Sequence, residues 1–433
     1  MGYPDVVILD NLVRSIDLYA CLKHEYGSRG ASGIIKRAEK NLKNALADIR
    51  SLPQDEKLAR REPNDPDTIR KLRPRGLRRI CAMSELRNYR DRLEGALLGR
   101  FAGCTLGAVV EGWPVEKMKA LAEENGDSFP PTDYWSRVPE PKRLRYETSY
   151  CEDYLRDNLN GVPVDDDVAY TLLGLLILEN SGKDFTTDDV GTAWVKYLPR
   201  ACSAERVALA NLRAGISASK AADENNPFCQ WIGADIRSDP WGYVCPGWPE
   251  KAAEMAFRDA YISHRRQGIY GEMFFAATIA AAFTVEDPLD ALEIGLTEIP
   301  CECTLAQQLR WALRVAPRIL DYRQAREAVD RRFPGMHKVH TINNACLTVW
   351  GITIGGTDLT RVIGETVAMG LDNDCTAATA GSIVGAVVGK QGIPEHWYRR
   401  FNNTVHSYLM RHKRFAISAL VNRFERQARK ICR

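Results

Sequence analysis

The sequence predicts an all-α protein, and two features of its apolar segments support that prediction. From residue 93 onward the apolar segments are long and rich in Ala and Leu, and few alternate strictly between apolar and polar residues as strands do. Clusters of turn-forming residues, such as 240–243, separate these segments. The clearest helical segments are residues 169–178, 273–283 and 376–388. We therefore expect one all-α domain over residues 91–433.

Residues 1–90 differ in composition from the rest of the chain. Apolar residues at helical spacing predict helices within 6–26 and 34–52. A polar, arginine-rich segment follows at 56–92, which is either a surface for an anionic partner or a solvated helical face and linker. We favour the second, because Tyr89 is the one side chain there suited to base stacking. We expect an N-terminal helical extension with a basic linker, and no nucleic-acid partner.

The composition is that of an ordinary globular protein and excludes several classes. With 433 residues, 45% apolar and 27% charged, the chain is not mostly disordered. A net charge of +3 is too small for a polycation that binds nucleic acid by charge alone. The scattered cysteines favour neither a disulfide framework nor a zinc site. There is no secretory signal pattern and no membrane-length apolar run, so we expect a cytoplasmic protein without a membrane partner.

Glycine recurs at every fourth residue along one predicted helix. Gly95, Gly99, Gly103 and Gly107 would form a single stripe on its surface, although each costs about 1 kcal/mol relative to Ala. The stripe indicates that another group approaches this backbone closely, and tight packing of two helices accounts for it. Packing does not explain why the carboxylate of Glu111 follows directly.

Two acidic clusters stand at the starts of apolar helices far apart in the chain. They consist of Asp165, Asp166 and Asp167, and of Asp372 and Asp374 beside Cys375. One carboxylate suffices to cap a helix, so capping does not account for clusters of this size. If the two helix starts meet, five carboxylates converge, and bound cations or shared protons must relieve their repulsion. Oxygen ligands of this kind select Mg²⁺, Mn²⁺ or Ca²⁺ rather than zinc.

Together these three segments resemble the ADP-ribosylglycohydrolase family, of the dinitrogenase reductase-activating glycohydrolase type, and its bacterial members most closely. The resemblance runs from about residue 93 to about residue 402, with the motifs in the family's order. It implies an ADP-ribosylglycohydrolase-like helical bundle with a central two-metal cleft. It also implies a hydrolase that cleaves the bond at C1 of a ribose.

The resemblance assigns roles to individual residues. It places the metal ligands at Asp165, Asp166, Asp167, Asp372, Asp374 and Cys375. The family has Thr where this chain has Asp165 and Cys375, and a thiol is a poor ligand for a hard cation. We expect two Mg²⁺ sites, with Mn²⁺ as the alternative. We also expect catalytic roles for Glu111 and Asp374, because a carboxylate can take the proton of the attacking water or assist the leaving group.

Candidate substrate contacts fall into three segments. They are Gly233, Asp235 and Arg237; His264, Gly268, Tyr270 and Gly271; and His340 with Asn344. Arg237 either holds a phosphate or carboxylate in a bidentate contact, or pairs with Asp235 or Asp239 inside the protein. Tyr270 either stacks on a base or belongs to the core.

The resemblance thus implies a metal-dependent glycohydrolase in which water attacks a ribosyl C1 bond. Two substrate classes stay open: an ADP-ribosyl group on a protein side chain, and a small N-ribosyl or nucleotide-type metabolite. The alternative is a catalytically inactive relative that acts as a binding or structural protein. We favour the enzyme, because an inactive copy would be expected to lose the metal-binding carboxylates that this chain retains.

Overall fold

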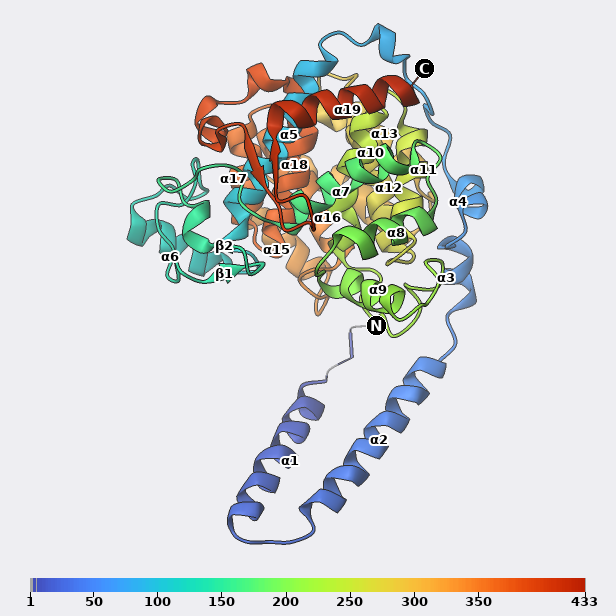
Figure 1. The fold of residues 1–433 in the computed structure, drawn as a ribbon, viewed down its shortest axis with the longest axis vertical. Coiled ribbons are helices and arrows are strands. Elements are labelled where there is room, and N and C mark those ends of the chain that lie inside the picture. Colours follow the sequence, from blue (N-terminus) through green and yellow to red (C-terminus); the bar gives the residue numbers. More distant parts are fainter. Residues whose placement is uncertain (1–2, 5, 433) are drawn as a thin grey trace. The chain divides into compact units, whose positions relative to one another are not determined.

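The computed structural model describes residues 3–4 and 6–432, and it confirms the predicted all-α class (Figure 1). Within these residues the β structure consists of two small antiparallel pairs. Strand β1 (Leu144–Arg145) pairs with β2 (Ser149–Tyr150), and β3 (Thr404–His406) pairs with β4 (Arg414–Ala416). No helix in the described part of the chain is long and apolar enough to cross a membrane.

The contacts divide the chain into two compact units, and the smaller holds residues 1–60 with 334–336. Its helices α1 (Val7–Glu25) and α2 (Ala31–Ser51) correspond to the two helices predicted for this region. Both helices are described in full, and neither buries a residue. Large apolar side chains such as Ile35 and Leu42 are therefore exposed on this unit.

The larger unit holds residues 61–333 and 337–433. Its helices in chain order, with α3 crossing the boundary, are α3 (Glu56–Arg61), α4 (Pro66–Leu72), α5 (Tyr89–Ala108), α6 (Val115–Asn125), α7 (Asp166–Ser181), α8 (Thr187–Tyr197), α9 (Ser203–Arg213), α10 (Asp239–Val244), α11 (Pro249–Ala260), α12 (Gln267–Ala282), α13 (Pro288–Gly295), α14 (Thr304–Val315), α15 (Tyr322–Arg332), α16 (Thr341–Gly355), α17 (Leu359–Ala368), α18 (Asn373–Val388) and α19 (Ile417–Ile431). Helix α12 is buried along its whole length, which places it in the core.

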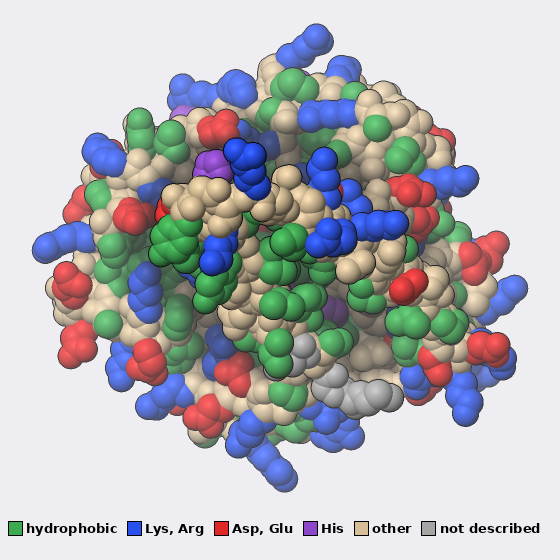
Figure 2. All heavy atoms as spheres, turned by 90° about the horizontal axis from the view of Figure 1, so that it is seen from below, with side chains coloured by type: hydrophobic (Ala, Val, Ile, Leu, Met, Phe, Trp, Pro, Cys, Tyr) green, Lys and Arg blue, Asp and Glu red, His purple; other side chains and the backbone are tan. Residues whose placement is uncertain are grey.

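Several arginines of the basic segment pair with carboxylates of the larger unit. Arg78 donates to Glu298 at 2.8 Å and Arg90 to Glu425 at 2.7 Å, and Arg73 contacts both Glu298 and Glu250. By contacts, the larger unit begins at residue 61. The domain boundary near residue 91 expected from the sequence stays a prediction. On the face seen in Figure 2, basic and acidic side chains are interspersed.

The glycine stripe lies between α5 and α18, which form the most extensive helix–helix contact among the described residues (Figure 1). A Cβ atom added at Gly99 would lie 2.1 Å from the carbonyl oxygen of Gly381, and one added at Gly381 would lie 2.3 Å from that of Gly99. A Cβ atom at Gly107 would lie 2.4 Å from the Cα of Asp374. Glycine is therefore needed along α5 because the backbone of α18 passes directly over it, and this contact ends at the second acidic cluster.

Candidate active site

The first turns of α7 and α18 meet, and this brings the two acidic clusters together. Asp165 caps α7 by accepting a hydrogen bond from the Asp167 N–H at 3.2 Å. The chain enters α18 through Gly370 and Leu371, both with positive φ (73° and 62°). That conformation is uncommon for leucine and turns Asp372 into the cluster, so some backbone strain is stored at the site.

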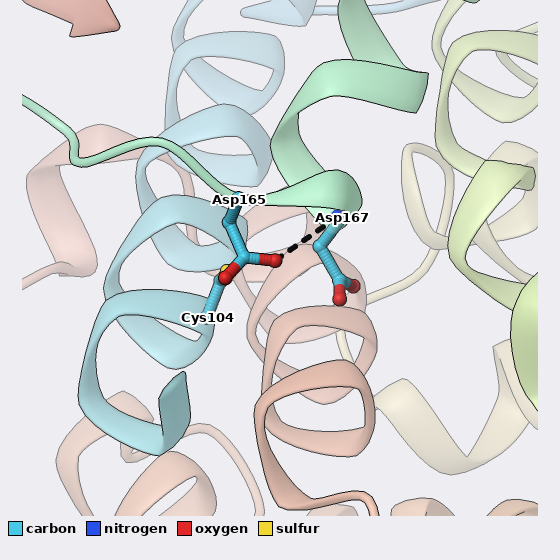
Figure 3. A group of neighbouring side chains, drawn as sticks. All are labelled: Cys104, Asp165 and Asp167. Atoms are coloured by element: carbon cyan, nitrogen blue, oxygen red, sulfur yellow. Dashed lines mark hydrogen bonds between the residues drawn. The ribbon is translucent and has the colours of Figure 1, made fainter. Parts of the chain in front are cut away.

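Three groups of side chains each place possible ligand atoms within 4.8 Å of one another. They are Glu111, Asp372 and Asp374; Asp167, Asp374 and Cys375; and Cys104, Asp165 and Asp167. Figure 3 shows the third group, in which the thiol of Cys104 on α5 faces the start of α7. The structure thus brings Glu111 and five of the six predicted metal ligands into these groups, and the remaining one, Asp166, lines the same cavity.

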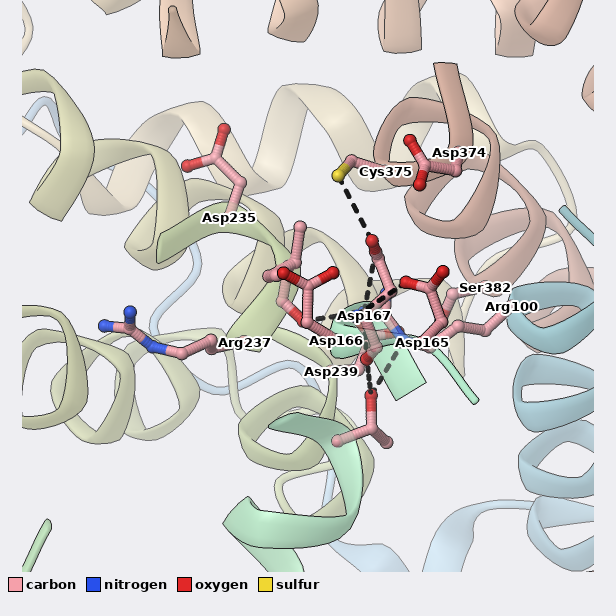
Figure 4. Close-up of polar contacts among 12 residues, drawn as sticks. Arg100, Asp165, Asp166, Asp167, Asp235, Arg237, Asp239, Asp374, Cys375 and Ser382 are labelled. Atoms are coloured by element: carbon pink, nitrogen blue, oxygen red, sulfur yellow. Dashed lines mark hydrogen bonds and ion pairs between the residues drawn. The ribbon is translucent and has the colours of Figure 1, made fainter. Parts of the chain in front are cut away.

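Asp167 is held by side chains from two other helices. The buried guanidinium of Arg100 donates to its Oδ1 at 3.2 Å and to Asp239 Oδ2 at 2.6 Å (Figure 4). The thiol of Cys375 donates to the other oxygen of Asp167 at 3.1 Å. Both oxygens of Asp167 therefore have partners within the protein.

A second arginine, Arg145 on β1, lies among the remaining carboxylates. Its Nη1 is 3.1 Å from Glu111 Oε2, and its Nη2 is 3.0 Å from Asp165 Oδ2 and 3.4 Å from Asp374 Oδ2. The neighbouring Tyr146 donates its hydroxyl to Asp166 at 2.6 Å. The hairpin of β1 and β2 is thus bound to both acidic clusters.

The pKa values of the carboxylates show that their negative charge is only partly balanced. Burial raises the pKa of Asp167 to about 8 against the opposing effect of Arg100, and burial with Glu111 raises the pKa of Asp372 to about 7. Burial and neighbouring carboxylates hold the pKa of Asp166 and Asp374 well above the usual range. Asp374 Oδ1 is buried without a hydrogen-bond partner among the described residues. Six carboxylates facing two guanidinium groups form a site suited to divalent cations.

The cluster opens into a cavity of about 460 Å³. Lining residues from the cluster are Glu111, Asp166, Asp372, Asp374 and Cys375. The other walls include Arg143, Arg145, Tyr146, Cys202, Glu205, Trp231 and Gly233. A cavity of this size is typical of small-molecule sites, and it places the acidic cluster beside space for a ligand.

Among the candidate substrate contacts, Gly233 lines this cavity and Asp235 does not. A Cβ atom at Gly233 would lie 2.2 Å from Glu205 Oε1, so glycine lets Glu205 reach its place. Asp235 is buried behind the wall, with Gly271 packed against it and no hydrogen-bond partner for either carboxylate oxygen among the described residues. Burial raises its pKa well above the usual range for an aspartate.

Arg237 lies in a buried ion-pair network outside the cavity lining. It donates to Glu205 at 2.7 Å, to Asp259 at 2.5 Å and to Glu272 at 3.3 Å. From the sequence we considered Asp235 and Asp239 as ion-pair partners of Arg237. Neither accepts a hydrogen bond from Arg237 among the described residues. Figure 4 shows its side chain pointing away from the acidic cluster, and a role in substrate binding stays a prediction.

His264, Gly268 and Tyr270 also lie outside the cavity lining. The Nδ1 of buried His264 is 2.8 Å from the hydroxyl of Ser263, and Gly268 packs against its ring. The hydroxyl of Tyr270 donates to the backbone carbonyl of Pro63. Tyr270 is thus tied to the segment before α4, and stacking of this ring on a substrate base stays a prediction.

His340 and Asn344 reach the acidic cluster through the start of α16. Asn344 accepts from the backbone N–H of Asp372 at 3.1 Å and donates to the carbonyls of Lys338 and His340 at 2.8 and 2.9 Å. His340 caps α16, its Nδ1 accepting from the Ile342 N–H at 3.2 Å. Asn344 therefore fixes the turn that carries Asp372, which is a positioning role.

We expect His340→Asn to remove an acid-sensitive contribution to stability. Burial lowers the pKa of His340 to about 4, and its capping nitrogen must be unprotonated to accept a hydrogen bond. Relative to an unfolded pKa near 6.5, this stability is present above pH 6.5 and is lost as the pH falls towards 4, by about 3 kcal/mol. Asn caps helices without titrating. Urea unfolding from pH 4 to 7.5 should show a flatter profile than wild type, and parallel profiles would contradict this. His24→Asn, at an exposed site, is the control.

Sequence reasoning missed several residues of this site. Arg145 and Tyr146 belong to no motif, and their pairing with distant carboxylates leaves no trace in local spacing. Arg100 did carry a signal, because it is the single charged residue within the small and apolar segment 95–108, and a charge in such a segment indicates a buried partner. For Trp231 the sequence offered only that a tryptophan can contact a ligand, with nothing that placed it at this cavity.

Three comparisons with known proteins add to these observations. The sequence profile of the ADP-ribosylglycohydrolase family matches residues 85–430. A search of curated proteins finds no match. Among solved structures, one described as an "ADP-ribosylglycohydrolase-related protein complex" matches over 78% of this chain and 99% of its own, with 22% identity and a TM-score of 0.51, which shows a common fold. The profile match covers most of the chain, so the chain belongs to the ADP-ribosylglycohydrolase family.

Proposed function

We propose that this protein is a divalent-cation-dependent hydrolase that cleaves a ribosyl C1 bond. Family membership supports a glycohydrolase. The observation that carries the cation dependence is the convergence of Glu111 with two acidic clusters beside a cavity. One buried oxygen of Asp374 there has no hydrogen-bond partner in the described part of the chain. Buried carboxylates with raised pKa values gain most from a cation that neutralises them.

Two of the three ligand groups share Asp374, and one of them suits a hard cation better than the other. Glu111, Asp372 and Asp374 offer only oxygen, as Mg²⁺ prefers, whereas Asp167, Asp374 and Cys375 include a thiol. We propose Mg²⁺ or Mn²⁺ at the first position and a weaker or softer cation at the second. When bound, such cations supply a Lewis acid that lowers the pKa of water and holds sugar hydroxyls.

The protein's own groups supply proton transfer and orientation. Glu111 has a half-exposed carboxylate at the cavity, and we propose that it takes the proton of the attacking water. Asp374 holds its orientation because α5 fixes its backbone through Gly107. Trp231, stacked on His337 at 4.1 Å, forms a rigid wall on which a flat ring of the substrate can lie.

We propose a ribose-containing substrate, either an ADP-ribosyl group on a protein side chain or a small N-ribosyl compound. Product detection by mass spectrometry over a panel tests this. The panel holds ADP-ribosylated Arg and Ser peptides, O-acetyl-ADP-ribose, NAD, nicotinamide riboside and its phosphate, and common nucleosides. We expect ribose or ADP-ribose release that EDTA abolishes and excess Mg²⁺ restores. Turnover that resists the chelator would refute the cation dependence.

The second candidate is a relative that binds its ligand without turnover. Arg145 among the carboxylates and Cys375 in place of a hydroxyl favour it. This candidate would be supported over the enzyme if a compound of the panel binds and no compound of the panel yields a product. The cytoplasmic location expected from the sequence stays a prediction.

A further inference from the structure

We infer that Arg145 is a built-in cation of the acidic cluster that competes with a divalent cation for Glu111 and Asp374. The inference rests on the proposed function, because it concerns how strongly this chain binds the cation. It makes Arg145 the residue that sets the affinity and the number of cations bound.

The guanidinium shares its partners with the oxygen-only ligand group. Arg145 contacts Glu111 and Asp374 at 3.1 and 3.4 Å, and these two residues with Asp372 are the group whose oxygens lie within 4.8 Å of one another. A cation held by Glu111 and Asp374 would lie beside the guanidinium. The side chains of Arg145 and Asp374 are both buried, so repulsion between like charges is weakly screened there. The two positive groups therefore exclude each other from these ligands.

The hairpin that carries Arg145 is held by its contacts with the acidic clusters, by an ion pair between Glu147 and Arg200, and by a hydrogen bond from the Val164 N–H to the Ser149 hydroxyl. Strands β1 and β2 contribute two residues each, and the turn between them includes Tyr146 and Glu147, both with positive φ. Besides the ion pairs of Arg145, Tyr146 donates to Asp166 and stacks on Tyr408 at 5.4 Å. Arg145 Nε is buried without a hydrogen-bond partner among the described residues. The side chain is therefore held by its three ion pairs and by its contacts with the rings of Tyr146 and Tyr154, and a divalent cation would have to replace the pairs with Glu111 and Asp374.

This arrangement gives the chain two states. Without a divalent cation, Arg145 offsets the repulsion among Glu111, Asp165 and Asp374 and keeps the site folded. With the cation, Arg145 leaves and the hairpin opens at the cavity wall. The measured association constant for the cation then equals its intrinsic value multiplied by the fraction of cation-free molecules in which Arg145 has withdrawn.

Titration of the full-length protein with Mn²⁺, followed by the loss of the free-ion EPR signal, tests the inference. We expect Arg145→Met to bind Mn²⁺ at least about tenfold more tightly than wild type. Arg145→Lys keeps a charge without the forked contact and should be intermediate, which also covers the case that the Met variant folds poorly. The matched control is Arg143→Met, because Arg143 lines the same cavity but its side chain pairs with Glu140, at 3.9 Å, and with no acidic-cluster residue among the described ion pairs.

Hydrogen exchange of the wild-type hairpin gives a second readout. The amides of Thr148 and Cys151 donate to the carbonyls of Arg145 and Arg143 at 3.1 and 2.9 Å, so opening should speed their exchange when Mn²⁺ is added. Equal Mn²⁺ affinity in wild type and Arg145→Met, or hydrogen exchange that Mn²⁺ leaves unchanged, overturns the inference about Arg145 but leaves the proposed cation dependence standing. Absence of Mn²⁺ binding in wild type and in every variant overturns the proposed cation dependence as well.

Discussion

Asp374→Asn should lower the rate of ribosyl hydrolysis by about 10³-fold or more while leaving the protein folded. Asp374 is fully buried and belongs to two of the three possible ligand groups. We propose Asp374 as a ligand shared by two cation positions, and a bound cation supplies several kcal/mol of charge stabilisation, so loss of this ligand accounts for an effect of about that size. Initial rates on the substrate that the panel identifies, measured in excess Mg²⁺, give the effect.

The same variant separates a role in chemistry from a role in stability. Burial and neighbouring carboxylates raise the pKa of Asp374, so its charged form destabilises the cation-free protein as the pH rises through that pKa. Asn has the same shape and no charge, so the cation-free variant should unfold at an equal or higher temperature than wild type at pH 8. Asp188→Asn, on the exposed face of α8, is the control for the effect of an Asp→Asn substitution outside the acidic clusters. Full activity of Asp374→Asn would refute the assigned role.

The fold and the central idea of the site could be predicted because both rest on local patterns. Long apolar segments at helical spacing define the helices one by one. An acidic cluster directly before such a segment lies at a helix start, where backbone N–H groups favour negative charge. The glycine stripe indicated close helix packing. The two acidic clusters indicated that carboxylates repel one another at a common site.

The partners of the arginines could not be predicted, because they are brought together only by the tertiary fold. Arg237 has candidate carboxylates two residues away on either side, yet it pairs with Glu205, Asp259 and Glu272 from other helices. A residue two positions away points in another direction in the 3₁₀ helix Ile232–Arg237, so closeness in sequence was the wrong guide. The same reason hid Arg145, whose three partners lie on three other segments.

Gly99→Ala should destabilise the larger unit by about 3 kcal/mol, the upper end for overpacked cores. Ala is otherwise the better helix former by about 1 kcal/mol, so a loss requires a steric cause. The added Cβ would lie 2.1 Å from the carbonyl oxygen of Gly381, which is backbone and cannot rotate away. Thermal unfolding of the full chain measures the effect. Gly191→Ala in α8 is the control, because the nearest atoms to its added Cβ belong to side chains and not to backbone, and they lie at 3.3 Å or more.

The stripe also links packing to chemistry, since its two ends should respond differently to the same substitution. Gly95→Ala would push against the backbone of Gly385 and Gly389, far along α18 from the cluster. Gly107→Ala would push against the Cα of Asp374, at 2.4 Å, and so move a proposed ligand. Both variants should lose stability, but Mn²⁺ affinity should fall only in Gly107→Ala. Equal losses of affinity at the two ends would mean that the stripe serves helix packing alone, whereas the expected difference makes α5 the element that positions Asp374.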